Sequence, residues 1–145
     1  MNSYLMKMAA AVCLLATGVV AQAADLQQGK PKIQSMDVIS FSPDGVLLVG
    51  DGKSAQVVLI DTKEKEVQKW TAQVADLKGK IAQKLGVATK DLELIHFASH
   101  PKSGKAFIAV RRQDNKKEHL ITVDGNGEIK EFSLDNVAYK TVSLP

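Results

Sequence analysis

Short apolar runs separated by turn residues make up most of the chain after residue 36. Runs of this length, bounded by Gly, Pro, Asn and Asp, are typical of β-strands joined by tight turns. Four early runs predict one antiparallel meander, at 37–41, 46–50, 56–61 and 66–70. The rhythm resumes further along and predicts a second set at 92–97, 105–110, 119–124 and 128–134, with the tail as a further candidate strand.

The predicted turns carry residues that favour a bend in the backbone. Proline presets φ at the second position of a turn, while Asp-Gly pairs supply side-chain caps and positive φ. The residues that we assign to structural turns on this basis are Pro43, Asp44, Gly45, Asp51, Gly52, Asp61, Asp124 and Gly125.

Between the two sets of strands the apolar positions change to a helical spacing. Positions i, i+4, i+7, i+11 and i+15 mark one helical face, and they are occupied by Trp70, Val74, Leu77, Ile81 and Leu85. Gly86 follows where a helix stop is expected. We therefore predict a helix at about 73–85, within an insert at 71–91. Such a stripe usually packs on a neighbouring sheet, and the alternative is a helix that binds a partner.

The two strand-rich halves resemble each other. Ile39-Ser40-Phe41 corresponds to Ile95-His96-Phe97, and each is followed by a turn with Pro and Gly. Asp61 and Asp124 each end a strand before a turn. Repeated four-stranded units at a period of about 40–50 residues are typical of β-propeller blades.

One stretch resembles the repeats of YVTN-type and WD-type β-propellers. The motifs that carry the resemblance are Phe41-Ser42-Pro43-Asp44-Gly45, then Leu48-Val49-x-Asp51, then Val57-x-x-Ile60-Asp61-Thr62 and Val67. A WD repeat has Trp where this chain has Ile60, so the YVTN-like branch fits better. The resemblance implies an all-β fold of two antiparallel four-stranded blades, at 37–70 and 92–145, with the helix inserted between them.

Two blades would leave their outer faces bare, because closure of a propeller takes about four to eight blades. Three arrangements satisfy this constraint. The chain is the N-terminal part of a longer protein, or the two blades pack as a sandwich covered by the helix, or several copies associate into a ring. We favour the first arrangement, because repeats that cannot bury their faces need neighbours.

The N-terminus predicts export. Lys7 precedes an apolar run of about twelve residues, and the small residues Ala21 and Ala23 follow at the −3 and −1 positions of the predicted cut, as in a secretory signal peptide. We predict a signal peptide at 1–23, a polar leader at 24–36, and a periplasmic or extracellular location without stable membrane insertion after cleavage. The one cysteine, Cys13, would leave with the signal peptide, so the mature chain would form no disulfide.

The net charge of the chain does not indicate which kind of partner it binds. The formal net charge is +3, from 19 basic and 16 acidic residues that are interspersed. This pattern differs from the clustered basic stripe of a nucleic-acid binder. One predicted hairpin tip groups four basic residues, which are a candidate contact for an anion or partner: Arg111, Arg112, Lys116 and Lys117. The alternative is an ordinary solvated tip, diluted by nearby acidic residues.

Three other candidate sites lack residues or neighbouring elements that their chemistry requires. Gly52-Lys53-Ser54 matches the end of a phosphate-binding loop, but Leu47 stands where the first Gly is required, and a strand follows in place of a helix. The loop that begins at Asp124 has Ile129 and Asp135 where an EF-hand needs Gly and Glu. His96, His100 and His119 have no diagnostic spacing for a metal site.

The sequence therefore predicts no catalytic residue, cofactor or metal site. The leading interpretation is an exported, non-catalytic propeller-type module that binds an unknown protein or other macromolecule. The alternative is the N-terminal part of an exported propeller enzyme, of the lactonase or quinoprotein dehydrogenase type, whose funnel site would be completed by further blades or by self-association.

Overall fold

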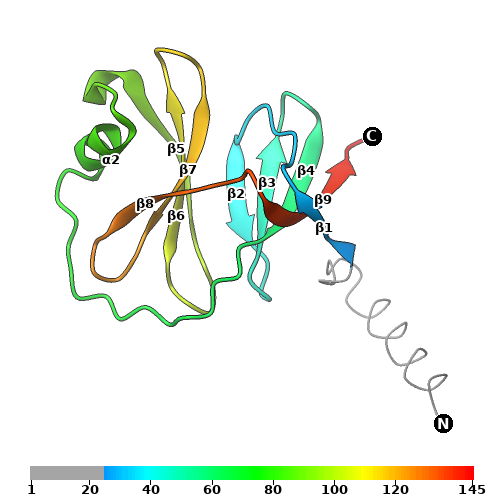
Figure 1. Cartoon of the computed structure of the whole chain (residues 1–145), viewed down its shortest axis with the longest axis horizontal. Helices are drawn as coiled ribbons and strands as arrows, with labels where there is room; N and C mark the ends of the chain where they lie inside the picture. Colours follow the sequence, from blue (N-terminus) through cyan, green and yellow to red (C-terminus); the bar gives the residue numbers. More distant parts are fainter. Residues whose placement is uncertain (1–24) are drawn as a thin grey trace, which may run out of the picture.

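Two antiparallel β-sheets and one α-helix form three stacked layers in the computed structural model (Figure 1). From left to right in Figure 1 these are the helix α2, a four-stranded sheet and a five-stranded sheet. The structure describes residues 25–145, so the predicted signal peptide lies outside the described residues.

The first sheet has five strands in the order β1-β9-β4-β3-β2. Hairpins join β2, β3 and β4, while β9 returns from the end of the chain to pair antiparallel with β4 and with β1. The bounds are Gln27–Gly29 for β1, Val38–Phe41 for β2, Val46–Asp51 for β3, Gln56–Asp61 for β4 and Val137–Ser143 for β9.

The second sheet is a four-stranded meander in the order β5-β6-β7-β8. Its strands are β5 (Leu92–Ser99), β6 (Ala106–Arg112), β7 (Glu118–Val123) and β8 (Ile129–Phe132), preceded by α2 (Leu77–Leu85) and the 3₁₀ turn η2 (Thr89–Asp91). A register shift between Leu94 and His96 kinks β5 where it passes the edge strand β2 of the first sheet.

The main core lies between the two sheets. Alternation along each strand sends one set of apolar side chains inward, and the buried set is Met36, Ile39, Leu47, Val49, Val58, Ile60, Phe107, Ala109, Leu120 and Val137. The rings of Phe41, Phe107 and Phe132 form a chain of edge-to-face contacts, with centroids 5.1 and 5.7 Å apart. Such contacts add to the gain from burial alone.

A second core lies between the second sheet and α2. Ile81 and Ala82 on the helix pack against β5, β6 and β7, whose contributions are Leu92, Ile108, Val110, Ile121 and Val123. The predicted helix is therefore confirmed in type and in its packing on a sheet, but it begins at Leu77. Asp76, in a left-handed conformation, caps it by accepting a hydrogen bond from the N–H of Gly79.

The prediction of two four-stranded units is wrong for the first sheet. Residues 66–70, expected as its fourth strand, form no strand. The place beside β4 is taken by β9, from the tail, and β1 makes the fifth strand. Val137 and Tyr139 of β9 reach the main core, which explains why this segment pairs there. The polar leader also differs from expectation, since it contains β1 and the buried residues Ser35 and Met36.

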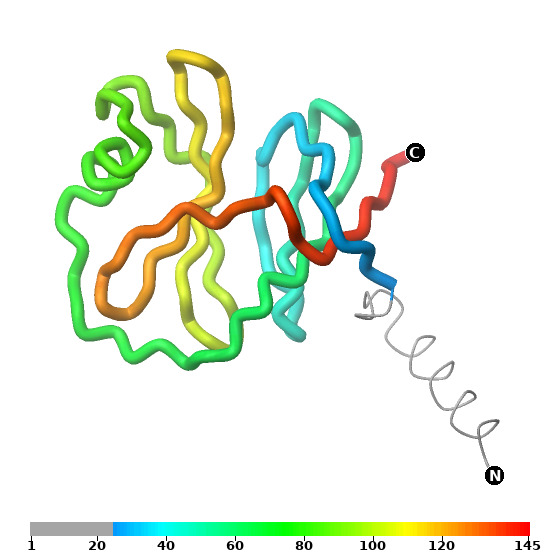
Figure 2. Tube along the Cα trace, viewed as in Figure 1, coloured from blue at the N-terminus to red at the C-terminus, as the bar shows by residue number. Residues whose placement is uncertain are grey.

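The connection from β4 to α2 runs in extended form past the hairpin turns of the second sheet (Figure 2). Gln68 N–H donates to the carbonyl of Ser103 at 2.7 Å, and Thr71 N–H donates to that of Gly125 at 2.9 Å. The indole N–H of Trp70 donates to the carbonyl of Gly104 at 3.0 Å. We call residues 66–72 the strap, because they tie two turns of the sheet together.

Candidate functional site

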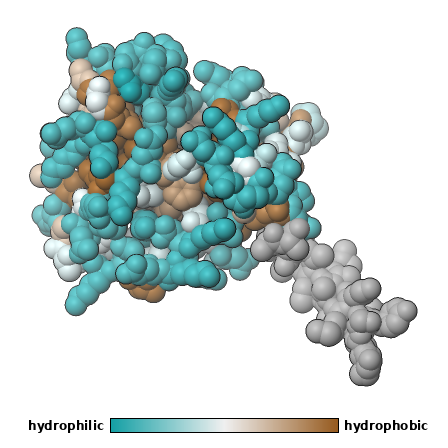
Figure 3. All heavy atoms as spheres, viewed as in Figure 1, coloured by the Kyte–Doolittle hydropathy of each residue, from teal (hydrophilic) through white to brown (hydrophobic). Residues whose placement is uncertain are grey.

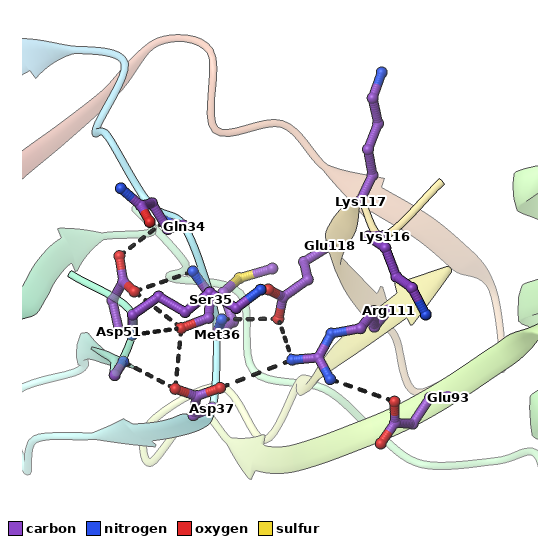
Figure 4. A network of polar contacts seen from close by, with 12 residues as sticks. Gln34, Ser35, Met36, Asp37, Asp51, Glu93, Arg111, Lys116, Lys117 and Glu118 are labelled. Carbon is purple, nitrogen blue, oxygen red and sulfur yellow. Dashed lines mark hydrogen bonds and ion pairs between the residues drawn. The ribbon is translucent and has the colours of Figure 1, made fainter. Parts of the chain in front are cut away.

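Arg111 is the centre of a polar cluster at one end of the two sheets (Figure 4). Its guanidinium lies 3.8 Å from the carboxylate of Asp37, 3.4 Å from that of Glu93 and 3.5 Å from that of Glu118. Asp37 immediately precedes β2, Glu93 belongs to β5 and Glu118 belongs to β7. The guanidinium of Arg111 is thus shared by three carboxylates. It links the segment that precedes β2 in the first sheet to the second sheet.

Glu118 is the most buried acid of this cluster, with 7% of its side chain exposed. Its Oε1 accepts a hydrogen bond from the N–H of Met36 at 2.8 Å. Its Oε2 and the Nε of Arg111 are buried without a hydrogen-bond partner in residues 25–145. A buried charge is tolerated when it is paired and hydrogen-bonded, so the ion pair with Arg111 and the hydrogen bond from Met36 together hold Glu118 in place.

Asp51 organises the loop beside this cluster. Its carboxylate accepts hydrogen bonds from the backbone N–H groups of Gln34, Ser35 and Ser54 and from the side chains of Ser35 and Gln56. Burial acts to raise the pKa of Asp51, but these donors outweigh it and hold the pKa at about 2. Asp51 is therefore an ionised structural hub that fastens the leader to the β3–β4 turn.

The other predicted turn residues lie in turns or at strand ends. Pro43, Asp44 and Gly45 connect β2 to β3, and Gly52 follows β3. Asp61 ends β4 and accepts a hydrogen bond from the N–H of Lys63, while Asp124 accepts from Asn126 and Glu128 in the turn that includes Gly125. These acids hold the backbone, which is the structural role expected of them.

The four basic residues of the predicted tip do not form one cationic surface. Arg111 is enclosed by its three acids, and Arg112 makes two hydrogen bonds to the carboxylate of Asp114, at 3.0 and 2.8 Å. Lys116 donates to the side chain of Gln113. Lys116 and Lys117 also line a groove that Arg111 does not line. Anion binding by the tip stays a prediction.

This groove has a volume of about 710 Å³ and lies between the leader and the ends of β7 and β8. Its apolar lining includes Ile33, Met36, Leu120, Phe132 and Leu134, and its charged lining contains lysines and acids in equal number. Because the charges of the lining balance, the groove shows no preference for an anion or a cation.

The three histidines lie apart and serve separate local roles. The Nδ1 of His96 is 3.2 Å from the backbone nitrogen and 2.9 Å from the backbone oxygen of Ile39. The ring is therefore hydrogen-bonded to the backbone of the edge strand β2. His100 Nδ1 accepts from the N–H of Ser103 at 3.0 Å, and burial lowers the pKa of this ring. His119 pairs with Glu131. No group of metal-ligating side chains is found among residues 25–145.

The side of the first sheet that faces away from the second sheet is largely apolar and partly exposed. Strand alternation and register place one set of side chains there, and we call it the outer face: Val38, Ser40, Val46, Leu48, Val57, Leu59, Asp61, Ala138, Lys140 and Val142. Val38 is 51% exposed and Val142 is 43% exposed, whereas Leu48 and Val57 are half-buried and Leu59 is 7% exposed. No helix or strand within residues 25–145 packs over this face.

Exposed apolar side chains also lie away from the outer face, since Phe97 is 55% exposed and Trp70 is 46% exposed. The side shown in Figure 3 is mostly hydrophilic, with apolar residues visible only in patches between polar ones. Exposed apolar surface of more than a few residues marks an interaction site on a soluble protein. The sequence reasoning named Asp61 of the outer face as a turn residue and named no residue of this face as a binding site. The signal was present, because β3 and β4 are apolar at successive positions, as in strands buried on both faces.

Comparison of the chain with protein families, with curated proteins and with solved structures finds no match. Within residues 25–145, no helix is long and apolar enough to cross a membrane. The candidate site therefore rests on the geometry of this chain alone.

Proposed function

We propose that the chain is a non-catalytic binding module of the β-propeller type, and that the outer face is the surface with which it binds a macromolecule. The observation that carries the proposal is the difference between the sheet faces. The inner face of the first sheet is covered by the second sheet, and the far face of the second sheet is covered by α2. The outer face carries the exposed side chains of Val38 and Val142, and no helix or strand within residues 25–145 covers it.

The strand order supports the comparison with propeller blades. In each sheet the first strand of the meander lies at an edge, β2 in one sheet and β5 in the other, and these two edges are adjacent. Blades of a propeller are likewise stacked meanders whose faces cover one another. Export to the periplasm or beyond stays a prediction from the N-terminal residues, as does the alternative of a propeller enzyme.

The proposal is tested by photo-cross-linking from a single cysteine. Cys13 belongs to the predicted signal peptide, so Val142→Cys would give the exported protein one thiol for a cross-linker. Lys84→Cys, on the exposed side of α2, is the matched control. We expect adducts from position 142 in the native host, few from position 84, and loss of the adducts when Val57→Lys is added. Equal labelling at both positions, or none at 142, would contradict the proposal.

A further inference from the structure

His100 lines a pocket that is distinct from the groove described above. The pocket has a volume of about 620 Å³ and lies where the β2–β3 turn, the segment after β4 and the β5–β6 turn come together. We call it the His100 pocket. Within residues 25–145, only Asp61 belongs both to this pocket and to the outer face, so binding here is separate from binding there.

The His100 side chain is held in a fixed orientation. The residue is 3% exposed, and its ring packs edge to face on the ring of Phe41, with centroids 5.0 Å apart. Its Nδ1 accepts hydrogen bonds from the N–H of Ser103 at 3.0 Å and from that of Lys102 at 3.3 Å. A nitrogen that accepts carries no proton, so the proton of the neutral ring is on Nε2. Burial lowers the pKa of His100, which favours this neutral form.

The Nε2–H of His100 is a donor that meets no acceptor within residues 25–145, because the hydrogen bonds of the ring are all made by Nδ1. Gly45 lies against this side of the ring, since a Cβ at position 45 would be 2.7 Å from Nε2 and 3.0 Å from Cε1. Both residues line the pocket. Because Gly45 has no side chain, the Nε2 edge of the ring is left open to the pocket. A donor on a largely buried ring is stabilised by an acceptor.

The charges at the pocket favour an anion as that acceptor. Three exposed lysines line it, and none of them forms a salt bridge within residues 25–145: Lys63, Lys65 and Lys102. Three acids line it as well, but Glu64 is already paired with Lys105, at 3.0 Å between Oε1 and Nζ. Asp44 and Asp61 are then set against three lysines, which leaves an excess of one positive charge.

We propose that the His100 pocket binds a small molecule through a carboxylate group. One carboxylate oxygen accepts the hydrogen bond from His100 Nε2–H. The other oxygen is free to accept from a lysine ammonium at the rim, because a carboxylate has two acceptor oxygens. Asp44 and Asp61 oppose a larger negative charge, so a ligand with one carboxylate suits the pocket better than a multiply charged anion. This site is additional to the proposed function of the outer face.

Titration of ¹⁵N-labelled protein with acetate, followed by ¹H–¹⁵N NMR, measures this binding. Sodium chloride and methylammonium chloride at the same concentrations are the comparisons. We expect acetate to cause saturable shifts of the backbone N–H signals of Gly45 and Ser103 and of the ring nitrogens of His100. Acetate that causes no saturable shift, or chloride that causes the same shifts as acetate, would overturn the proposal.

His100→Asn tests the role of the ring donor. The asparagine oxygen can still accept from the N–H of Ser103 as a side-chain turn cap, whereas the Nε2–H is lost. We expect this variant to lose the saturable shifts of Gly45 and Ser103, and a melting curve checks that it remains folded. A folded variant that binds acetate as the unchanged chain does would refute the assignment to His100.

Charge reversal at the rim provides a test that leaves the buried ring in place. The double variant Lys65→Glu with Lys102→Glu changes two exposed side chains and is expected to weaken acetate binding by about fivefold. The matched control is Lys80→Glu on the exposed side of α2, which is expected to bind acetate as the unchanged chain does. Equal affinity of the double variant and the control would contradict the proposed site.

Discussion

At the scale of single residues, Asp51 shows what local reasoning can and cannot recover. Its place after a strand and before Gly52 predicts a turn residue, and Ser54 N–H does donate to it within that turn. Its other backbone donors, Gln34 and Ser35, lie 17 and 16 positions earlier in the chain. A turn rule considers only near neighbours, so the fastening of the leader could not be predicted from the sequence.

Asp51 predicts a specific acid response. Its pKa is about 2 in the folded protein against an ordinary value of 3.8. A depressed folded pKa stabilises the fold above the ordinary value, and the benefit is lost as the pH falls toward 2. The difference corresponds to about 2 kcal/mol in the free energy of unfolding.

Denaturant unfolding of Asp51→Asn between neutral and acidic pH checks this response. We expect the variant to be less stable than the unchanged chain by about 2 kcal/mol at neutral pH, with the gap closing toward pH 2. The control is Asp135→Asn, whose side chain is 80% exposed, and it is expected to have little effect. A gap that stays constant with pH would show that the charge of Asp51 is not what stabilises the loop.

Arg111 shows that charged residues close together in the sequence need not be partners in the fold. The sequence groups it with Arg112 and two lysines on one hairpin. In the fold, alternation sends the Arg111 side chain toward Asp37, Glu93 and Glu118, which come from separate strands. A count of nearby charges in the sequence misses partners that only the packing of two sheets brings together.

At the scale of elements, strand type was more predictable than strand pairing. The seven apolar runs that became β2 to β8 were recognisable from their composition and turns. The position of β9 was not, because its partner β4 lies about 80 positions earlier and both sheets offered it an edge. The segment 66–70 was mistaken for a strand, since its alternating polar residues fit a strand but also fit the extended strap.

The strap gives an element-scale prediction. A Cβ on Gly125 would overlap the carbonyl of Lys69, so Gly125→Ala is expected to displace the strap from the turn. Trp70 is the only tryptophan of the chain, and its indole N–H is held by Gly104. We expect a red shift of its fluorescence and a lower melting temperature, while Glu128→Ala, whose side chain is 59% exposed and pairs with Lys130, changes neither. Unchanged fluorescence in Gly125→Ala would contradict the proposed fastening.

At the scale of the whole molecule, the structure places its apolar surfaces unevenly. The sequence argument that two stacked sheets leave outer faces bare holds for the first sheet, while the inserted helix covers the second. The helix could be assigned to a sheet from its stripe, but which of the two sheets it covers depends on the tertiary arrangement. That choice decides which face remains open, and so it decides the candidate site.

Cross-linking from the outer face in the native host tests the central claim most directly, namely that this face is the binding surface. We predict adducts from Val142→Cys, and loss of these adducts when Val57→Lys is added. Lys84→Cys, on the exposed side of α2, is expected to give few adducts. Equal labelling at both positions, or no adduct from position 142, would contradict the claim.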